Sequence, residues 1–173
     1  MDGITIRKAT ADDLATIGLI GRQTFFETFA PHNTAANMQQ YLEESFNDAK
    51  LREELSNPES FFFVAMEGTK PVGYLKLNTG NAQTEVQGDT ALEIERIYVS
   101  SDYHGKKVGQ LLYEKALGTA QALGKSYLWL GVWERNPRAI RFYEKNGFVA
   151  FDQHLFRMGE EEQTDIMMKK MLP

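Results

Sequence analysis

The turn "HGKKVG", residues 104–109, gathers the most chemically suggestive side chains of the chain. It separates an alternating apolar stretch from an amphipathic one. A glycine-bearing turn that opens a helix presents unpaired backbone N–H groups and the positive end of the helix dipole, an arrangement that suits phosphate. His104, Lys106 and Lys107 add positive charge. Many such turns bind nothing, and exposed lysines are usually only solvated, so the motif is weak by itself.

The stretch before the turn, residues 91–99, carries a second irregularity. Its apolar residues lie at even positions up to Ile94 and at odd positions from Ile97. A regular strand keeps one parity on one face, so the switch near 95–96 predicts a β-bulge. A bulge frees backbone N–H groups and can separate two neighbouring strands. The alternative is a regular strand that is buried on both faces.

The elements around the turn are predicted from periodicity and from capping residues. Thr10 begins a helix that Pro31 ends, and Asn136 begins a later helix that Gly147 ends. This order indicates an α/β fold in a single domain, 1–173, with a mixed central sheet of about seven strands and flanking helices. Strands are expected at 4–9, 60–67, 71–78, 91–99 and 127–133. Two more are expected in "FVAFDQHLFRM" and "TDIMMKKM", which flank an acidic turn at 159–163. Helices are expected at 10–30, 33–46, 48–56, 108–124 and 136–148.

The composition limits the classes of function. With 42% hydrophobic and 25% charged residues, the chain is typical of a soluble globular protein. No apolar run approaches the length of a membrane span, and the N-terminus lacks the apolar region of a signal peptide, so we expect a cytoplasmic protein. Cys is absent and the three His residues lack ligand spacing, so no metal site is expected. The formal charge of −5 argues against a nucleic-acid binder and suits a cationic small substrate.

Two segments of the chain resemble the acetyl-CoA motifs of the GNAT superfamily of N-acetyltransferases. "IYVSSDYHGKKVGQLL" is similar to its hydrophobic-x-Val strand, loop and Gln/Arg-x-x-Gly-x-Gly/Ala turn. "NPRAIRFYEKNGF" is similar to its second motif, Asn-x-x-Ala-x-x-x-Tyr-x-x-x-Gly-Phe. The motifs occur in the right order, and the resemblance covers nearly the whole chain. It implies the GNAT-like (acyl-CoA N-acyltransferase) fold and an acetyltransferase with acetyl-CoA as cosubstrate.

Within the superfamily, the chain resembles the bacterial Pai-type spermidine/spermine N-acetyltransferases in "ETF", "YLEESF", "LEIERIYV", "WLGVWE" and "MGEEEQTDIMM". Two positions depart from the superfamily motif. His104 stands where Gln or Arg is usual, and Lys107 stands where the first Gly is usual. Glycine there allows the close approach of a pyrophosphate. Lys107 keeps a backbone N–H and adds a cation, so we expect CoA binding to survive with weaker affinity.

The resemblance also assigns the contacts of the cofactor. The strand before the turn would bind the pantetheine arm as an added strand, and the turn would hold the pyrophosphate. Asn136 has an ordinary explanation as a helix cap, and Tyr143 as a packing aromatic. Tyr143 nevertheless lies two helical turns, roughly 10 Å, beyond Asn136 on the same face, within reach of the thioester sulfur. The implied cofactor-binding residues are Ile97, Tyr98, Val99, Gly105, Lys106, Lys107, Val108, Gly109, Gln110 and Asn136.

Acetyl transfer to an amine needs a free amine, a stabilised oxyanion and a proton for the leaving thiolate. An alkylammonium of pKa roughly 10 is almost wholly protonated at neutral pH, so a carboxylate must accept its proton. Glu95, at the expected bulge, is the first candidate for this base, and Glu93 is the second. A backbone N–H near Ile97 would serve the carbonyl oxygen, and Tyr143 would protonate the thiolate. The two glutamates could equally be exposed residues on the polar side of a strand.

A polyamine acceptor carries several ammonium groups and requires spaced carboxylates among aromatic side chains. Glu27 lies among phenylalanines near the end of the first helix, Glu134 follows Trp133, and Glu160–Glu162 form the acidic turn. Each of these could also be an ordinary solvated charge. Together with the resemblance they favour spermidine or spermine as the acceptor, with Glu27, Glu95 and Glu134 as substrate-binding residues.

Other functions are compatible with the same sequence. A GNAT enzyme could acetylate a peptide or protein amine, or another small amine such as an aminoglycoside. Lys107 in place of glycine favours a CoA-binding domain without catalysis. A plain nucleotide-binding α/β protein is disfavoured, because its glycine turn would follow the first strand of the chain. Exposed strands at the C-terminal end favour a homodimer.

Overall fold

Seven strands form one sheet in the order β1-β2-β3-β4-β5-β7-β6 in the computed structural model, which describes residues 3–85, 87–158 and 160–173. The strands are β1 (Ile4–Lys8), β2 (Ser60–Glu67), β3 (Lys70–Asn78), β4 (Ala91–Val99), β5 (Tyr127–Trp133), β6 (Val149–Met158) and β7 (Glu161–Met171). The helices are α1 (Leu14–Phe29), α2 (Ala35–Ser45), α3 (Asp48–Ser56), α4 (Val108–Ala122) and α5 (Pro137–Lys145). The predicted α/β fold with a mixed sheet of seven strands is confirmed.

Capping residues determine where the helices begin. Thr10 Oγ1 accepts a hydrogen bond from Asp12 N at 3.3 Å and opens the short turn that leads into α1. Asn47 Oδ1 accepts from Lys50 N at 2.9 Å at the start of α3. Each bond satisfies one of the N–H groups that the first helical turn leaves unpaired.

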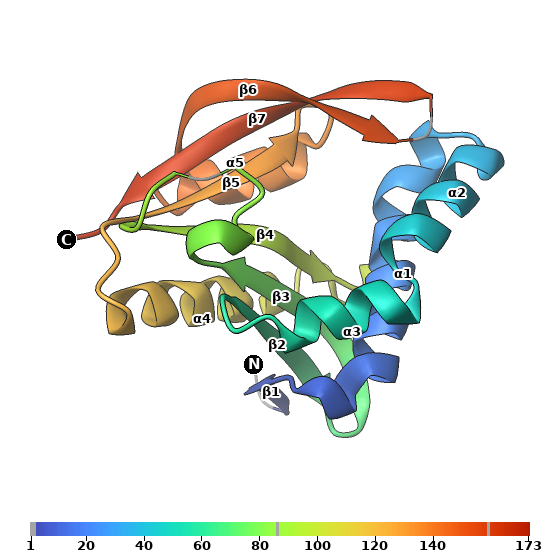
Figure 1. Cartoon of the computed structure of the whole chain (residues 1–173), viewed down its shortest axis with the longest axis horizontal. Coiled ribbons are helices and arrows are strands. Elements are labelled where there is room, and N and C mark those ends of the chain that lie inside the picture. The colour runs from blue at the N-terminus through green and yellow to red at the C-terminus, as the bar shows by residue number, and fades with distance from the viewer. Residues whose placement is uncertain (1–2, 86, 159) are drawn as a thin grey trace.

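The helices cover the two faces of the sheet separately. Apolar side chains of α1, α2 and α3 pack with those of β2 and β3 in one cluster, and those of α4 and α5 pack on the opposite face in a larger cluster. Figure 1 shows α1, α2 and α3 grouped at one side and the β6–β7 pair along the top of the sheet. The core is therefore a sheet between two helical layers.

The sheet opens between its two central strands. Every other neighbouring pair is antiparallel, whereas β4 and β5 are parallel and pair only over Ala91–Glu93 with Tyr127–Trp129. Beyond Glu93 the two strands no longer pair. The predicted separation of neighbouring strands is confirmed, and it lies directly beside the turn at 104–109.

The predicted bulge in β4 is confirmed as well. Lys76 of β3 pairs with Arg96 and the next residue pairs with Ile94, so Glu95 has no partner in β3. The extra residue brings the even and odd apolar positions to one face: Ile94 belongs to the cluster under α4 and α5, and Ile97 packs against the same cluster. A break in parity thus preserves one continuous apolar face.

The predicted acidic turn at 159–163 is wrong in its extent. Met158 and Glu161 face each other across β6 and β7, so Glu161 and Glu162 belong to the strand. Glu162 pairs with Arg157 at 3.0 Å. Gly159, the first residue of that predicted turn, lies outside the described residues. Of the helices in the described part of the chain, none has the length and apolarity that crossing a membrane requires.

Candidate functional site

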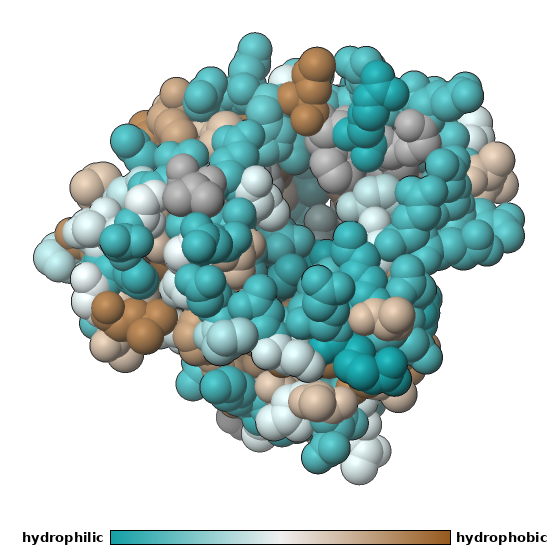
Figure 2. Space-filling model, viewed as in Figure 1, coloured by the Kyte–Doolittle hydropathy of each residue, from teal (hydrophilic) through white to brown (hydrophobic). Residues whose placement is uncertain are grey.

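A cavity of about 1160 Å³ occupies the opening between β4 and β5 and extends under β6 and β7. Figure 2 shows the face of Figure 1 hollowed near its centre, with hydrophilic residues around the hollow. Lys106 and Glu134 are the predicted site residues that are not among its lining residues. The predicted residues that line it are Glu27, Glu93, Glu95, Ile97, Tyr98, Val99, Gly105, Lys107, Val108, Gly109, Gln110, Asn136 and Tyr143.

Two cations of the cavity lie at the start of α4, and we call this side the cationic end: Lys107, Arg138, the His104 ring that contacts Arg138, and the amides of 108–110. The N–H groups in the first turn of a helix have no helical acceptor, and the helix dipole adds positive potential. An alanine-sized side chain at Gly105 would meet nothing within 4 Å. The cationic end therefore offers amide donors with open space in front of them, which suits a phosphate group.

Lys107 adopts a backbone conformation that favours glycine. Its φ of 65° makes it the one non-glycine residue with positive φ in the described part of the chain. The left-handed region costs an L-residue roughly 1–2 kcal/mol. The strain accounts physically for the glycine that the family motif places here, and it persists because Lys107 O accepts the helical bond from Leu111 N at 3.1 Å.

The backbone of β4 directs alternate residues into the opening. Ser100 N donates to Val72 O of β3 at 2.9 Å. Because bonding direction alternates along an antiparallel pair, Tyr98 also bonds β3, whereas Ile97 and Val99 direct their N–H and C=O groups toward the opening. Of the three predicted backbone contacts, Ile97 and Val99 are available to a bound chain, and Tyr98 contributes its ring.

His104 connects the end of β4 with the start of α5. Its Nε2 lies 2.9 Å from Val99 O, and its Nδ1 contacts the guanidinium of Arg138. A carbonyl only accepts and a guanidinium only donates, so His104 carries its proton on Nε2. At this position, where the motif has Gln or Arg, the His104 ring donates a hydrogen bond to a backbone carbonyl and holds Arg138 beside the turn.

Asn136 and Tyr143 lie on α5 as the sequence predicts. Asn136 Oδ1 accepts from Ala139 N at 3.2 Å, which confirms the cap, and Asn136 also lines the cavity. Tyr143 is 7% exposed and packs edge-on against Phe142 and Phe148. Burial raises the pKa of Tyr143 far above its ordinary value, so the phenol stays protonated at neutral pH.

Several predicted residues already have other partners. Glu27 accepts from Ser101 N at 3.1 Å and from Ser101 Oγ at 2.9 Å, which ties α1 to the segment after β4. Gln110 Nε2 donates to Asn146 Oδ1 at 3.1 Å, which ties α4 to α5. Lys106 lies over the ring of Tyr103. Glu134 is exposed at the end of β5. Their roles in binding stay predictions.

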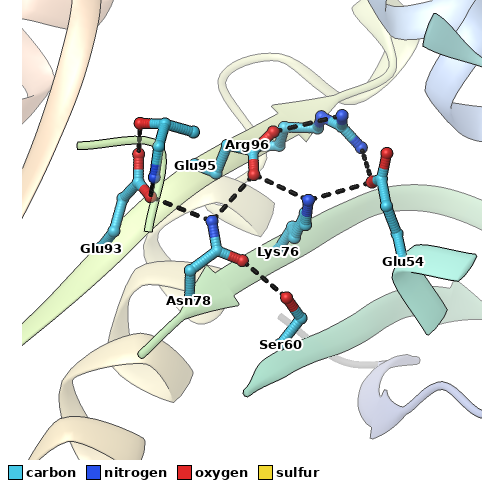
Figure 3. Close-up of polar contacts among 8 residues, drawn as sticks. Glu54, Ser60, Lys76, Asn78, Glu93, Glu95 and Arg96 are labelled. Atoms are coloured by element: carbon cyan, nitrogen blue, oxygen red, sulfur yellow. Dashed lines mark hydrogen bonds and ion pairs between the residues drawn. The ribbon is translucent and has the colours of Figure 1, made fainter. Parts of the chain in front are cut away.

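Glu95 belongs to a buried ionic network between β3, β4 and α3. Its carboxylate lies 2.7 Å from Lys76 Nζ and 3.2 Å from Arg96 Nη2, and both cations also contact Glu54 at 3.0 Å. Figure 3 shows the two cations directed at both carboxylates. Burial alone would raise the pKa of Glu95, but Arg96 and Lys76 outweigh it and hold the pKa at about 2.

Glu93 has a different environment although it lies only two residues away. It is 3% exposed and accepts hydrogen bonds from Asn78 Nδ2 at 3.0 Å and Thr84 N at 2.8 Å, and from the Thr84 hydroxyl. Asn78 also donates to Glu95 at 2.8 Å and so connects the two carboxylates. Burial raises the pKa of Glu93 above its usual range, because these hydrogen bonds offset only part of the desolvation. The alternative of two exposed glutamates is wrong.

The opposite side of the cavity is acidic, and we call it the acidic end: Glu85, Glu93, His154 and Asp165. Glu85 comes from the segment between β3 and β4, His154 from β6 and Asp165 from β7. The sequence alone does not single out Glu85, His154 or Asp165. No local motif marks them, because strand pairing between distant segments is what assembles them.

The described residues contain no group of three or more His, Asp or Glu side chains arranged to hold a metal ion. The polar groups of the cavity are instead amide donors and cations at one end and carboxylates at the other. This arrangement is suited to holding an anionic and a cationic molecule side by side.

Known proteins are similar to this chain in sequence and in fold. Residues 23–148 match the model of the acetyltransferase (GNAT) family. An uncharacterized N-acetyltransferase of Lactobacillus delbrueckii subsp. lactis is 38% identical over 99% of both chains. A spermidine N(1)-acetyltransferase of Thermoplasma acidophilum is 25% identical over 96% of both. The crystal structure of the PaiA N-acetyltransferase of that organism, in complex with coenzyme A, superposes with a TM-score of 0.82 at 25% identity and covers 98% of this chain and 99% of its own.

Proposed function

The chain belongs to the GNAT family of acetyltransferases, and we propose that it transfers an acetyl group from acetyl-CoA to a primary amine of a polyamine. It is an N-acetyltransferase that uses acetyl-CoA. One observation chiefly supports the proposed acceptor amine and the proposed catalytic residues. A single cavity carries phosphate-suited amides and cations at one end and buried carboxylates at the other.

The cosubstrate supplies a thioester carbonyl as electrophile and a thiolate as leaving group. Its diphosphate would accept hydrogen bonds from the amides of 108–110. The positive charges of Lys107 and Arg138 would attract it as well. Its pantetheine arm would pair with the C=O group of Ile97 and the N–H group of Val99, which face the opening. The amide N–H groups of Asn136 would donate to a pantetheine carbonyl. These groups orient the thioester along the opening between β4 and β5.

Glu93 is the better candidate for the base that deprotonates the acceptor. A carboxylate held at a pKa of about 2 by two cations accepts a proton poorly, which disfavours Glu95, the first candidate of the sequence. Glu93 has a raised pKa and lines the cavity. Since Thr84 and Asn78 occupy its oxygens, the ammonium proton would pass to Glu93 through a water molecule. Glu95 then serves to hold Lys76 and Arg96 in place.

The remaining steps close the proton balance. The free amine attacks the thioester carbon, so that a C–N bond forms; the attacking nitrogen then loses its surplus proton to water, and the C–S bond breaks. The backbone N–H of Ile97, which faces the opening, would stabilise the oxyanion. Tyr143, neutral because it is buried, would donate its phenolic proton to the departing thiolate and regain one from solvent.

The acidic end favours a polycationic acceptor over a neutral one. Carboxylates at Glu85, Glu93 and Asp165 lie beside aromatic side chains such as Trp133, and these two features together attract alkylammonium groups. The 25% identical relative is named for spermidine. The substrate residues of this proposal differ from those predicted from sequence, since Glu134 lies outside the cavity lining and Glu27 binds Ser101.

An acceptor screen tests the proposal. The protein is incubated with acetyl-CoA and, at equal concentrations, with spermidine, spermine, an aminoglycoside or an N-terminal peptide, and free thiol is measured. We expect the polyamines to give the highest kcat/KM. A peptide or aminoglycoside that exceeds them would replace the proposed acceptor. CoA binding by calorimetry without thiol release from any amine would instead indicate a domain that binds CoA without catalysing transfer.

A further inference from the structure

A narrow slot crosses the middle of β5 at the acidic end of the cavity. Gly131 is exposed there between Trp129 and Trp133, both of which are buried, and all three line the cavity. Residues two apart along a strand lie on the same face, so the open face of Gly131 is flanked by the two indoles along β5. Because glycine has no side chain, an opening is left on this face that is reached from the cavity.

The carboxylate of Asp165 lies at the base of the slot, and the His154 ring is already near it. A Cβ added at Gly131 would lie 3.5 Å from Asp165 Oδ2 and 3.8 Å from the His154 ring. His154 stands between two carboxylates, with Nδ1 2.9 Å from Glu85 Oε1 and Nε2 3.7 Å from Asp165 Oδ2. The Asp165 side chain is 17% exposed, so its charge needs a partner.

We propose that the slot over Gly131 binds the non-reacting ammonium group of a diamine or polyamine acceptor, with Asp165 as the specificity-determining carboxylate and His154 as a resident competitor for it. The inference rests on the proposed acetylation of an amine and goes further, because it states which part of the acceptor is recognised and by what. A protonated His154 neutralises Asp165, whereas a neutral His154 leaves Asp165 to an ammonium ion.

The spacing along the sheet suits such an acceptor. Glu93 pairs with Trp129 in the short parallel ladder, and Gly131 lies two residues further along β5. With about 3.3 Å per residue and about 4.8 Å between strands, the slot is about 8 Å from the proposed base. That distance corresponds to two amino groups joined by a short aliphatic chain. An acceptor with one amino group would leave the slot empty.

His154 limits this recognition because it already lies between two carboxylates. Within the described residues, the charged groups that the structure brings against His154 are Glu85, from the segment before β4, and Asp165, from β7; β5 contributes Gly131 without charge. An ammonium group that enters the slot therefore competes with the His154 ring for Asp165.

The experiment measures discrimination, which is the ratio of kcat/KM for spermidine to kcat/KM for n-butylamine, at one pH near neutrality. The ratio removes the protonation of the catalytic base, which both amines share. Asp165→Asn should lower the ratio about tenfold, the size of one lost charged hydrogen bond. His154→Gln should raise the ratio, because it removes the imidazole that competes for Asp165.

Matched controls separate charge from fold. Asp152→Asn changes an exposed carboxylate on the same hairpin and should keep the wild-type ratio. Gly131→Ala, whose Cβ meets its neighbours at ordinary contact distances, narrows the slot without displacing them and should lower the ratio severalfold even if Asp165→Asn folds poorly.

A wild-type ratio near one, or a ratio that Asp165→Asn and Gly131→Ala leave unchanged, overturns the inference. So does a His154→Gln variant whose ratio is lower than that of the wild type. These results differ from a failure of the proposed function, in which neither amine would release thiol from acetyl-CoA. If both amines were acetylated with equal efficiency, the proposed acetyltransferase activity would stand, but the slot would not be an ammonium-binding site.

Discussion

The cationic and the acidic ends of the cavity differ in charge and in the way they are built. The cationic end combines helix amides with His104, Lys107 and Arg138, whereas the acidic end combines buried carboxylates with the aromatic walls of β5. One end suits an anionic molecule and the other a cationic one. The opening between β4 and β5 joins them, so the two reacting molecules would approach each other from opposite directions.

The largest expected effect concerns the acidic end alone. Glu93→Gln should lower kcat by about a thousandfold, because the variant cannot accept the ammonium proton. CoA affinity, measured by calorimetry, should change little, since the cationic end is untouched. In the wild type, kcat/KM should fall as the pH drops through the raised pKa of Glu93, where the carboxylate becomes protonated. Near-normal turnover of the variant would remove Glu93 as the base.

Glu95→Gln should act on stability, in contrast to its neighbour. Removal of one carboxylate leaves Lys76 and Arg96 with only Glu54, and breaking a buried ionic network costs about 3 kcal/mol. The folded-state pKa of about 2 lies below the ordinary value of 4.5, so wild-type stability should be full above 4.5 and decrease as the pH falls toward 2. Urea unfolding across this range measures both effects. A variant of unchanged stability but lost turnover would return the role of base to Glu95.

Tyr143→Phe tests the junction between the two ends. The substitution keeps the ring and its packing but removes the phenolic proton, so kcat should fall by about a hundredfold while CoA affinity stays within a few fold of the wild type. A thioester with a better leaving group than CoA thiolate should recover part of the rate. Full activity with acetyl-CoA would show that another group, or water, protonates the thiolate.

The smallest effect concerns the cationic end. Lys107→Gly should relieve the strain of a positive φ, and after the added flexibility of the unfolded chain the variant should be more stable by about 0.5 kcal/mol. It also loses a cation near the diphosphate, so CoA affinity should fall severalfold at low salt, which reverses the expectation from the motif that glycine here binds CoA more tightly than lysine. Lys106→Gly, which relieves no such strain, should be less stable than the wild type. Tighter CoA binding by Lys107→Gly would mean that the side chain obstructs the phosphate.

The two ends were not equally predictable from the sequence. The cationic end lies in two contiguous segments, 104–110 and 136–143, whose glycines, caps and helical periodicity are local signals. The parity switch in 91–99 likewise marks the bulge, because a strand with one buried face records its register in its own residues. The fold and the region of the cofactor follow from such signals.

The acidic end depends on contacts that no local signal records. Glu85, His154 and Asp165 meet only after β6 and β7 pair and the segment before β4 folds against them. Likewise, Glu95 and Glu93 share a face in the sequence, yet their environments diverge because Lys76 and Arg96 reach one carboxylate and Thr84 the other. Ranking the two bases therefore required the tertiary structure.

A crystal structure of the protein with CoA and spermidine tests the central claim most directly. We predict the diphosphate within about 3 Å of the amides of 108–110, the sulfur beside Tyr143 and the polyamine between Glu93 and Asp165. A closed opening between β4 and β5, with CoA bound elsewhere, would contradict the account. So would a polyamine seated away from the acidic end.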